Sequence, residues 1–482
     1  MRFKEGHIFV LGLCLGLRLA AMLAIAPWLP EAKQMYFGSH DQGYHRLAIN
    51  LMYGKGYIWE AKDIAALEPT PSREILAWKR PGEPETLWPP GYPAFLAVIY
   101  TLFGVSVTAV LIAQALFATI SCWFLIHATE SLSNKRAGLL AGGLYATEPT
   151  LILLTNSIRS EGIFIPLLCI IVFLLSRLLT ATNERNRLIT LVGLGITMGI
   201  ATWIRVNTVF ILCVLIFMIL IIYWQNTRCL LRSASWVALI GVIYLTTLIP
   251  WYWRNYRLFG EWAFSTSASY NLLEVYKYRD GEEAILHKAY LKAVAAGEDP
   301  QRLTPFQRAR YWRQTALDEW RTNFGSSGRL YLTRLAFIMT NPGLGEWGKV
   351  LRVKSLYNTH STDFSTRFQS LVQRVHESGA IGIVMLAYVI LYLTIFYISV
   401  AICLVCWRIA FSQKVIRQLA LITFFASSMM LLTSINNIGP RMRSPAIVLL
   451  IPVVALGLTN LLMYKQQRVD KWVLGAASNK ES

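Results

Sequence analysis

Long apolar stretches without a single charged residue constrain this chain most strongly. Residues 379–407 and 444–464 contain no Asp, Glu, Lys or Arg, and a helix needs about 20 mostly apolar residues to cross a bilayer. Composition agrees, because 55% of the 482 residues are hydrophobic and only 15% are charged, against about 25% in soluble domains. We therefore expect an all-α polytopic membrane protein. A soluble enzyme, a disordered regulator and a secreted disulfide-rich module are excluded.

Hydropathy and the placement of Lys and Arg together predict about ten transmembrane helices. The expected spans are residues 8–29, 106–129, 135–149, 160–180, 186–203, 206–225, 233–253, 379–408, 415–435 and 444–464. The first of them follows basic residues as a signal peptide would, but it has no clear small-x-small cleavage site, so we interpret it as a retained helix. Lys and Arg gather in the short loops that this arrangement puts inside, and both termini are then cytoplasmic.

The spans divide the chain into four regions. These are a transmembrane module (1–253) with a first outer loop (30–92), an outer-face helical segment (254–378), the C-terminal transmembrane helices (379–464) and a cytoplasmic tail (465–482). Residues 42–53, 308–324 and 329–340 show helical spacing of apolar residues. Residues 94–103 are apolar but too short to cross, which predicts a helix lying along the outer membrane surface.

Arginines in the short outer turns violate the charge rule and are the most informative feature of the chain. They are Arg159, Arg205, Arg441 and Arg443, with Arg254 and Arg257 just beyond the seventh span. Guanidinium groups at the lipid–water boundary suit a phosphate whose lipid tail stays in the bilayer, because Arg makes bidentate contacts to phosphate oxygens. The alternative is that each arginine reaches phospholipid headgroups or pairs with a nearby carboxylate such as Glu161.

Three carboxylates are expected at a similar depth on the outer side. Asp41 precedes a helical stretch, so it is either an N-cap or a general base that accepts the proton of an attacking hydroxyl or amine. Glu148 and Glu161 lie at the ends of two spans. His40 and His45 flank Asp41, which leaves a divalent metal as an open alternative. Their spacing matches no known metal signature, and we favour solvated or hydrogen-bonded histidines.

With these residues the chain resembles a membrane glycosyltransferase of the GT-C architecture, in the group that includes protein O-mannosyltransferases and lipid A aminoarabinose transferase. Four ordered blocks carry the resemblance: Asp41 to Tyr57, Trp88 to Ala97, Pro250 to Gly260 and Gly439 to Pro445. With the spans between them they cover most of residues 1–465. Two departures are that Gln42, not a second acid, follows Asp41, and that Met442 stands where the last block often has tyrosine.

The resemblance implies a polyprenyl-phosphate-linked sugar as donor and an outer-face active site in the transmembrane module. It implies Asp41 as the catalytic carboxylate and Glu148 as a second acidic position. The donor phosphate is then expected among basic residues chosen from Arg159, Arg205, Arg254, Arg441, Arg443, Lys79 and Arg80. Residues expected to contact the substrates are Tyr44, Tyr57, Trp88, Tyr92 and Glu161. A single displacement at the anomeric carbon would invert its configuration.

Two rival functions remain open. A transporter or flippase of a polyisoprenoid-phosphate lipid would use the same arginines, although we find no internal repeat of the kind transporters often show. A non-catalytic binding or assembly protein would leave Asp41 and the arginines without a shared purpose. The acceptor is open among a lipid, a glycan and a protein. Nucleic acid is not an expected partner, because the excess of Lys and Arg follows the membrane topology and is not gathered in one soluble basic patch. We expect a bacterial inner membrane with a periplasmic site, and an endoplasmic-reticulum homologue is the alternative.

Overall fold

The computed structural model of the chain describes residues 5–26, 28, 42–60, 80–227, 229–343, 347, 364–434 and 439–478, and its regular elements there are helices, with one isolated β-bridge between Ile58 and Pro84. Within these residues, nine helices are long and apolar enough to cross a membrane, and one bent pair brings the number to ten. The expectation of an all-α multi-pass membrane protein is confirmed, and each of the ten predicted spans coincides with a helix or with the bent pair.

The nine spanning helices follow the chain as predicted by hydropathy. They are α1 (Glu5–Ile25), α7 (Val107–Leu132), α10 (Glu161–Thr180), α11 (Glu184–Ile204), α12 (Thr208–Thr227), α13 (Leu230–Phe259), α20 (Phe364–Val405), α22 (Lys414–Thr433) and α23 (Ser444–Ser478). Helices α10 and α23 lie at the centre, because 67% and 72% of their apolar windows are buried, whereas α13 is a peripheral helix with 22% buried. Helix α20 is broken at Gly379, which has φ 62°.

The third span is bent by 60° between α8 (Lys135–Thr147) and α9 (Pro149–Thr155). The break falls at Glu148, whose backbone is extended (φ −66°, ψ 117°). Proline disfavours helical geometry in the residue before it and is tolerated at the first position of a helix. The Glu-Pro pair therefore ends α8 and starts α9, and the Glu148 carboxylate accepts a hydrogen bond from the Leu151 amide.

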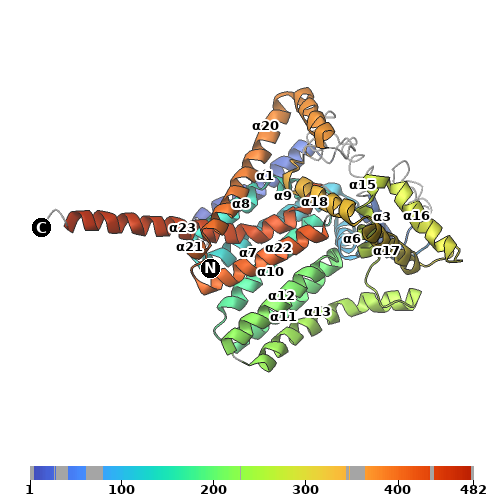
Figure 1. Ribbon diagram of the computed structural model, residues 1–482, viewed down its shortest axis with the longest axis horizontal. Coiled ribbons are helices and arrows are strands. Elements are labelled where there is room, and N and C mark those ends of the chain that lie inside the picture. The colour runs from blue at the N-terminus through green and yellow to red at the C-terminus, as the bar shows by residue number, and fades with distance from the viewer. Residues whose placement is uncertain are drawn as a thin grey trace.

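Two segments that are far apart in sequence form a second layer at one end of the bundle. We call this layer the head and define it as residues 42–60, 80–104 and 260–343. Its helices are α3 (Gln42–Met52), α6 (Gly91–Phe103), α14 (Ser267–Glu274), α15 (Lys277–Asp280), α16 (Glu282–Ala295), α17 (Pro305–Thr322) and α18 (Phe324–Thr340). In Figure 1, α3, α6, α15, α16 and α17 gather at the right, and α23 runs from the bundle to the C-terminus at the left.

The head has a small hydrophobic core of its own, which includes Leu273, Ile285, Trp312 and Ile338. Met442, from the 3₁₀ turn Pro440–Met442, packs into this core and so joins the head to the start of α23. The predicted helices at 42–53, 94–103, 308–324 and 329–340 are confirmed as α3, α6, α17 and α18. The head therefore lies against the turn that carries Arg441.

Candidate functional site

Three arginines from three different turns meet around one buried carboxylate. The Arg205 Nη1 atom lies 2.5 Å from Glu161 Oε1, and Arg441 Nε lies 4.0 Å from the same oxygen. The Arg159 guanidinium also acts electrostatically on Glu161. We call Arg159, Arg205 and Arg441 the arginine cluster. The sequence expected all three near a phosphate, and the structure brings them to one place.

Local backbone geometry puts each of these side chains in position. Glu161 is the first residue of α10, where the partial positive charge of a helix N-terminus favours a carboxylate. Arg205 ends α11 in an extended conformation (φ −145°, ψ 117°). Arg441 lies in the 3₁₀ turn before α23. Turns between tightly packed helices therefore supply the cluster, and its geometry depends on the packing of α10, α11 and α23.

The cluster holds an excess of positive charge. Three guanidiniums and one carboxylate leave a net charge of +2. The Glu161 side chain is 2% exposed, whereas those of Arg205 and Arg441 are 16% and 28% exposed. Arg205 also lies over the Phe164 ring, with its Cζ 5.6 Å from the centroid. The carboxylate is thus enclosed while the guanidiniums remain within reach of a ligand, which suits an anion with more than one charge.

A run of aromatic rings extends from the head to this cluster. Trp59 contacts Trp88 (centroids 5.5 Å apart), Trp88 contacts Tyr44 (5.2 Å), and Tyr44 contacts Tyr92 (5.1 Å). Burial raises the pKa of Tyr44, and Glu161 and Arg205 act electrostatically on the same hydroxyl. Tyr92 donates to Gln114 Oε1 at 2.9 Å. Tyr44, Trp88 and Tyr92 are therefore brought together beside the arginines.

Gly43 allows this close approach between α3 and the loop that carries Trp88. A Cβ atom built on Gly43 would lie 1.4 Å from Cζ3 of the Trp88 indole, a distance that the rigid ring system cannot relieve by a small rotation. The glycine is thus required by packing and not by its backbone angles. It sets how closely Tyr44 and Trp88 lie to one another.

Arg254 and Tyr57 lie apart from the cluster and fasten the first outer loop. Arg254 donates to the Glu85 carbonyl at 3.0 Å and to the Tyr57 carbonyl at 3.4 Å. Its guanidinium also stacks on Trp251, 4.4 Å from the ring centroid. The Tyr57 hydroxyl donates to the Trp88 carbonyl at 2.9 Å. Both side chains are thus engaged with the loop backbone.

Glu148, Arg443 and Arg18 form a separate, fully buried group. Of these three residues, Arg18 was not predicted from the sequence. Arg443 donates to the Ile338 and Asn341 carbonyls and, at 3.3 Å, to Thr150 Oγ1. Arg18, in α1, donates to the Cys14 carbonyl at 3.0 Å and to Thr155 Oγ1 at 3.3 Å. All three charged side chains have 0% exposure, and Glu148 and Arg443 attract one another. A lone arginine in an apolar span was the available signal.

Of the remaining predicted residues, the structure describes Arg80 and His45 but not Asp41, His40 and Lys79. Arg80 is exposed and donates to the Leu303 carbonyl at 3.3 Å, which ties the first outer loop to the 260–343 part of the head. His45 Nδ1 lies 2.9 Å from the Tyr100 hydroxyl. Asp41, His40 and Lys79 lie outside the described residues. Among the described residues, no group of three or more His, Cys, Asp or Glu side chains is arranged to hold a metal.

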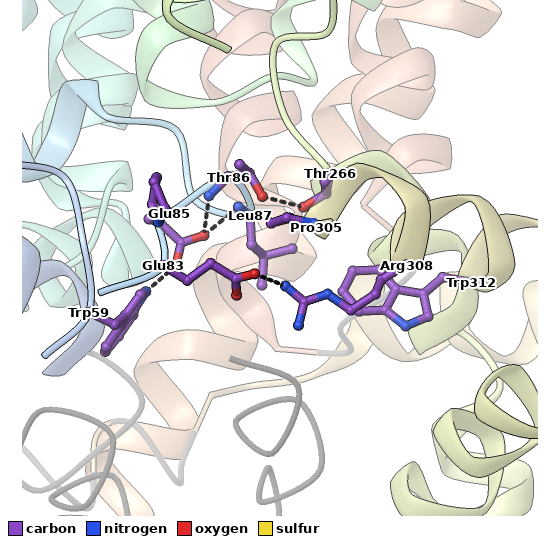
Figure 2. Close-up of a pocket in the computed structure, with 10 residues that line it drawn as sticks. Trp59, Glu83, Glu85, Thr86, Leu87, Thr266, Pro305, Arg308 and Trp312 are labelled. Carbon is purple, nitrogen blue, oxygen red and sulfur yellow. Dashed lines mark hydrogen bonds and ion pairs between the residues drawn. The ribbon is translucent and has the colours of Figure 1, made fainter. Parts of the chain in front are cut away.

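A pocket also opens where the first outer loop meets α17 (Figure 2). An ion pair crosses it, with Arg308 Nη2 2.5 Å from Glu83 Oε1. On the loop side, Glu85 accepts hydrogen bonds from the Thr86, Leu87 and Trp88 amides and from the Trp59 indole. Sequence reasoning singled out none of Glu83, Glu85 and Arg308. The pocket walls are thus joined by polar contacts between distant segments.

One family of known proteins matches part of this chain. Residues 88–253 match the model of a family described as dolichyl-phosphate-mannose-protein mannosyltransferase. Predicted site residues within the matched segment are Trp88, Tyr92, Glu148, Arg159, Glu161 and Arg205. The resemblance to polyprenyl-phosphate-dependent membrane glycosyltransferases is thereby confirmed for this segment. No curated protein sequence matches the chain at a significant level.

Several solved structures, among them the following two, are similar to the chain at low identity. The archaeal oligosaccharyltransferase AglB from Archaeoglobus fulgidus, in complex with an inhibitory peptide and a dolichol-phosphate, is 14% identical with a TM-score of 0.46. The alignment covers 98% of this chain and 52% of that one, so this chain spans about half the length of AglB. ArnT from Cupriavidus metallidurans, bound to undecaprenyl phosphate, is 13% identical with a TM-score of 0.40, and the alignment covers 94% and 77% of the two chains.

Proposed function

Because residues 88–253 match the model of a family of dolichyl-phosphate-mannose-protein mannosyltransferases, we propose that the whole chain transfers a sugar from a polyprenyl-phosphate-linked donor to an acceptor outside the membrane. The observation that carries the proposal is the arginine cluster, with its net charge of +2 at the junction of bundle and head. A lipid-linked phosphate can reach this depth while its tail remains between the spans. The acceptor is a lipid, a glycan or a protein side chain.

The phosphate chemistry follows from the charges of the cluster. As the bond from the anomeric carbon to the phosphate oxygen breaks, negative charge grows on the departing polyprenyl phosphate. Arg205 and Arg441 already point at a carboxylate, and guanidinium groups bind phosphate oxygens by the same charge-assisted hydrogen bonds. Fixed positive charge at the leaving group stabilises the transition state more than the ground state.

Asp41 is the proposed general base. It immediately precedes α3 and lies three residues before Tyr44 in the chain. Arg205 and Arg441 of the cluster act electrostatically on the Tyr44 hydroxyl. The acceptor hydroxyl or amine attacks the anomeric carbon, its proton passes to the Asp41 carboxylate, and polyprenyl phosphate leaves. One such displacement inverts the anomeric centre. Tyr44 and Trp88 offer ring faces for the sugar.

Arg254, Tyr57 and Arg80 have a supporting role in this proposal. Their hydrogen bonds go to backbone carbonyls of the first outer loop and of the head. They hold the loop that carries Trp88 above the cluster. Glu148 and Arg443 are enclosed between α9, α18 and α23, so we propose that they fix the turn that presents Arg441. The active face is the head side, which we assign to the periplasm of a bacterial inner membrane.

The first experiment is a turnover assay on the full-length protein in lipid nanodiscs. The donors are a panel of polyprenyl-phosphate sugars that begins with mannose, and a crude envelope extract supplies acceptors. We expect wild type to release polyprenyl phosphate only with acceptor present. Arg205→Ala should lower kcat/KM by about 100-fold, as loss of one charge-stabilising donor does, and Asp41→Asn by about 100-fold or more.

Arg257→Ala is the matched control. Arg257 is an exposed arginine near the C-terminal end of α13, where Arg254 also lies. Its guanidinium lies over Trp253, and it is not a member of the arginine cluster. We expect this variant to keep wild-type turnover. If wild type binds the lipids without cleaving any of them, and Asp41→Asn behaves identically, sugar transfer is wrong and lipid transport takes its place.

A further inference from the structure

We propose that Glu161 is an internal counter-charge that drives product release, because its carboxylate competes with the phosphate of the departing polyprenyl phosphate for Arg205. This inference rests on the proposed function and assigns a new role within the same site. Glu161 was expected among the residues that contact substrate. Its place in the structure is instead that of the anion itself, enclosed by the arginines that a phosphate would use.

Geometry brings the carboxylate and a bound phosphate to the same guanidiniums. Glu161 Oε1 lies 2.5 Å from Arg205 Nη1 and 4.0 Å from Arg441 Nε, so a single carboxylate oxygen faces two guanidiniums. The other carboxylate oxygen faces Ser160 Oγ at 3.4 Å. The carboxylate is 2% exposed and anchored in the first turn of α10. A phosphate that binds Arg205 and Arg441 must therefore share them with a negative charge that cannot leave.

The charges of donor and product differ, and Glu161 acts on that difference. The donor is a phosphodiester with a charge of −1, whereas a phosphate monoester carries about −1.5 to −2 near neutral pH, with a second pKa of about 6. Coulomb repulsion is proportional to charge, so Glu161 repels the dianionic product about twice as strongly as the donor. If neutralising Glu161 tightens donor binding about tenfold, it tightens binding of the dianion about 100-fold.

The charge of the cluster therefore affects two steps in opposite directions, because more positive charge stabilises the leaving phosphate but slows release of the product. Without a counter-charge the cluster would carry +3 and would hold the dianionic product more tightly than a cluster of +2 does. With Glu161 the cluster carries +2, which still stabilises the leaving phosphate but lets it go. Glu161 is therefore a positioning residue that acts on the ligand through Arg205. Its removal should convert an enzyme limited by another step into one limited by product release.

The test compares wild type with Glu161→Gln, which keeps the shape of the side chain and removes its charge. The full chain is placed in nanodiscs of a neutral phospholipid, and undecaprenyl phosphate is titrated at pH 8 and pH 5. For Glu161→Gln we expect a Kd for undecaprenyl phosphate at least tenfold lower at pH 8 and a smaller gain at pH 5, where the monoester keeps its second proton. Turnover should show a burst of one product per enzyme and then a lower kcat.

Glu184→Gln is the matched control, because Glu184 also pairs with an arginine, Arg232, but at the far ends of α11 and α13. Its product affinity and burst should equal those of wild type. If Glu161→Gln does not fold, Glu161→Asp replaces it. The shorter carboxylate withdraws from Arg205, and we expect severalfold tighter product binding, a gain that lost structure cannot produce.

Each outcome decides something specific. If wild type binds undecaprenyl phosphate and folded Glu161→Gln binds it equally or more weakly, the counter-charge role is overturned and the proposed function stands. If wild type does not bind undecaprenyl phosphate at all, the phosphate site of the proposed function fails, and this inference fails with it. Tighter binding that grows between pH 5 and pH 8 supports the inference, since only a charge effect follows the second ionisation of the ligand.

Discussion

At the residue scale, the described outer arginines fall into two groups according to their hydrogen-bond partners. Arg205 and Arg441 face a carboxylate and keep guanidinium surface exposed. Arg254 and Arg443 instead give their hydrogen bonds to backbone carbonyls of segments distant in sequence. A carbonyl partner leaves no trace in the sequence around an arginine. The sequence could therefore indicate that the outer arginines are unusual, but it could not separate those that face a ligand site from those that fasten the fold.

Gly43→Ala tests the close approach of α3 to Trp88. A Cβ atom there would meet the indole at 1.4 Å, and overpacking of a rigid site typically costs about 1 to 3 kcal/mol. We expect a lower melting temperature in nanodiscs and a raised donor KM, because Tyr44 and Trp88 move apart. Gly12→Ala is the control, since nothing lies within 4 Å of its Cβ position. Equal melting temperatures for the two variants would contradict the packing argument.

At the element scale, the sequence predicted helices well and their interruptions poorly. The spans follow from runs of apolar residues, and the amphipathic helices α17 and α18 follow from periodic spacing. The 60° bend between α8 and α9 was not predicted, because the third span was expected to end at residue 149. Its cause, Pro149 after Glu148, is visible in the sequence. Whether such a pair bends, kinks or ends a helix depends on which groups accept hydrogen bonds from the backbone amides that the break leaves unpaired. Here the Glu148 carboxylate accepts from the Leu151 amide.

The helices of the head are joined by a charge cluster that makes its stability depend on pH. Arg279 Nε lies 2.6 Å from Asp280 Oδ1, and Lys288 Nζ lies 2.9 Å from Glu319 Oε1 and 3.1 Å from Asp280 Oδ2. The Arg279 hydrogen bond lowers the pKa of Asp280. Burial acts to raise the pKa of Glu319, but hydrogen bonds from Lys288 and Arg279 outweigh it and lower that pKa.

Carboxyl groups with lowered pKa values in the folded state bind protons more readily when unfolded. Their stabilisation is therefore complete above the unfolded pKa values, which are about 4, and it is lost as pH falls through the folded values. We expect hydrogen exchange in α15 to α17 to be constant from pH 7 to 5, after correction for intrinsic rates, and to rise below about pH 4. Lys288→Met should bring the folded pKa values of Asp280 and Glu319 closer to their unfolded values, so the rise in exchange below about pH 4 should be smaller than in wild type. An equally large rise in that variant would refute the assignment.

At the whole-molecule scale, the head unites two segments that the chain separates by more than one hundred residues. The Glu83–Arg308 pair joins them with side chains that are only 13% and 5% exposed, and Figure 2 shows it crossing the pocket between loop and α17. Hydropathy predicted that both segments lie outside the membrane. It carried no information on their contact, because pairing across such a distance depends on tertiary packing that no local pattern encodes.

A double-mutant cycle measures this link. Removing one partner of a buried ion pair leaves an uncompensated charge and typically costs about 3 to 5 kcal/mol. We expect Glu83→Gln and Arg308→Met each to lower the thermal stability of the head, and the double variant to lose little more than either single one. Hydrogen exchange across residues 80–90 and α17 provides the local readout. Additive losses would show that the two side chains act independently.

The length of α23 has a practical consequence. At 1.5 Å per residue, its 35 residues extend about 53 Å, while the hydrocarbon core of a bilayer is about 30 Å thick. Because its first half is packed at the centre of the bundle, the last turns form a continuous rod about 20 Å longer than the membrane requires. A helical fusion partner spliced in register onto this rod would tumble with the protein as one particle, which would provide the alignment mark that single-particle imaging of so small a membrane protein needs.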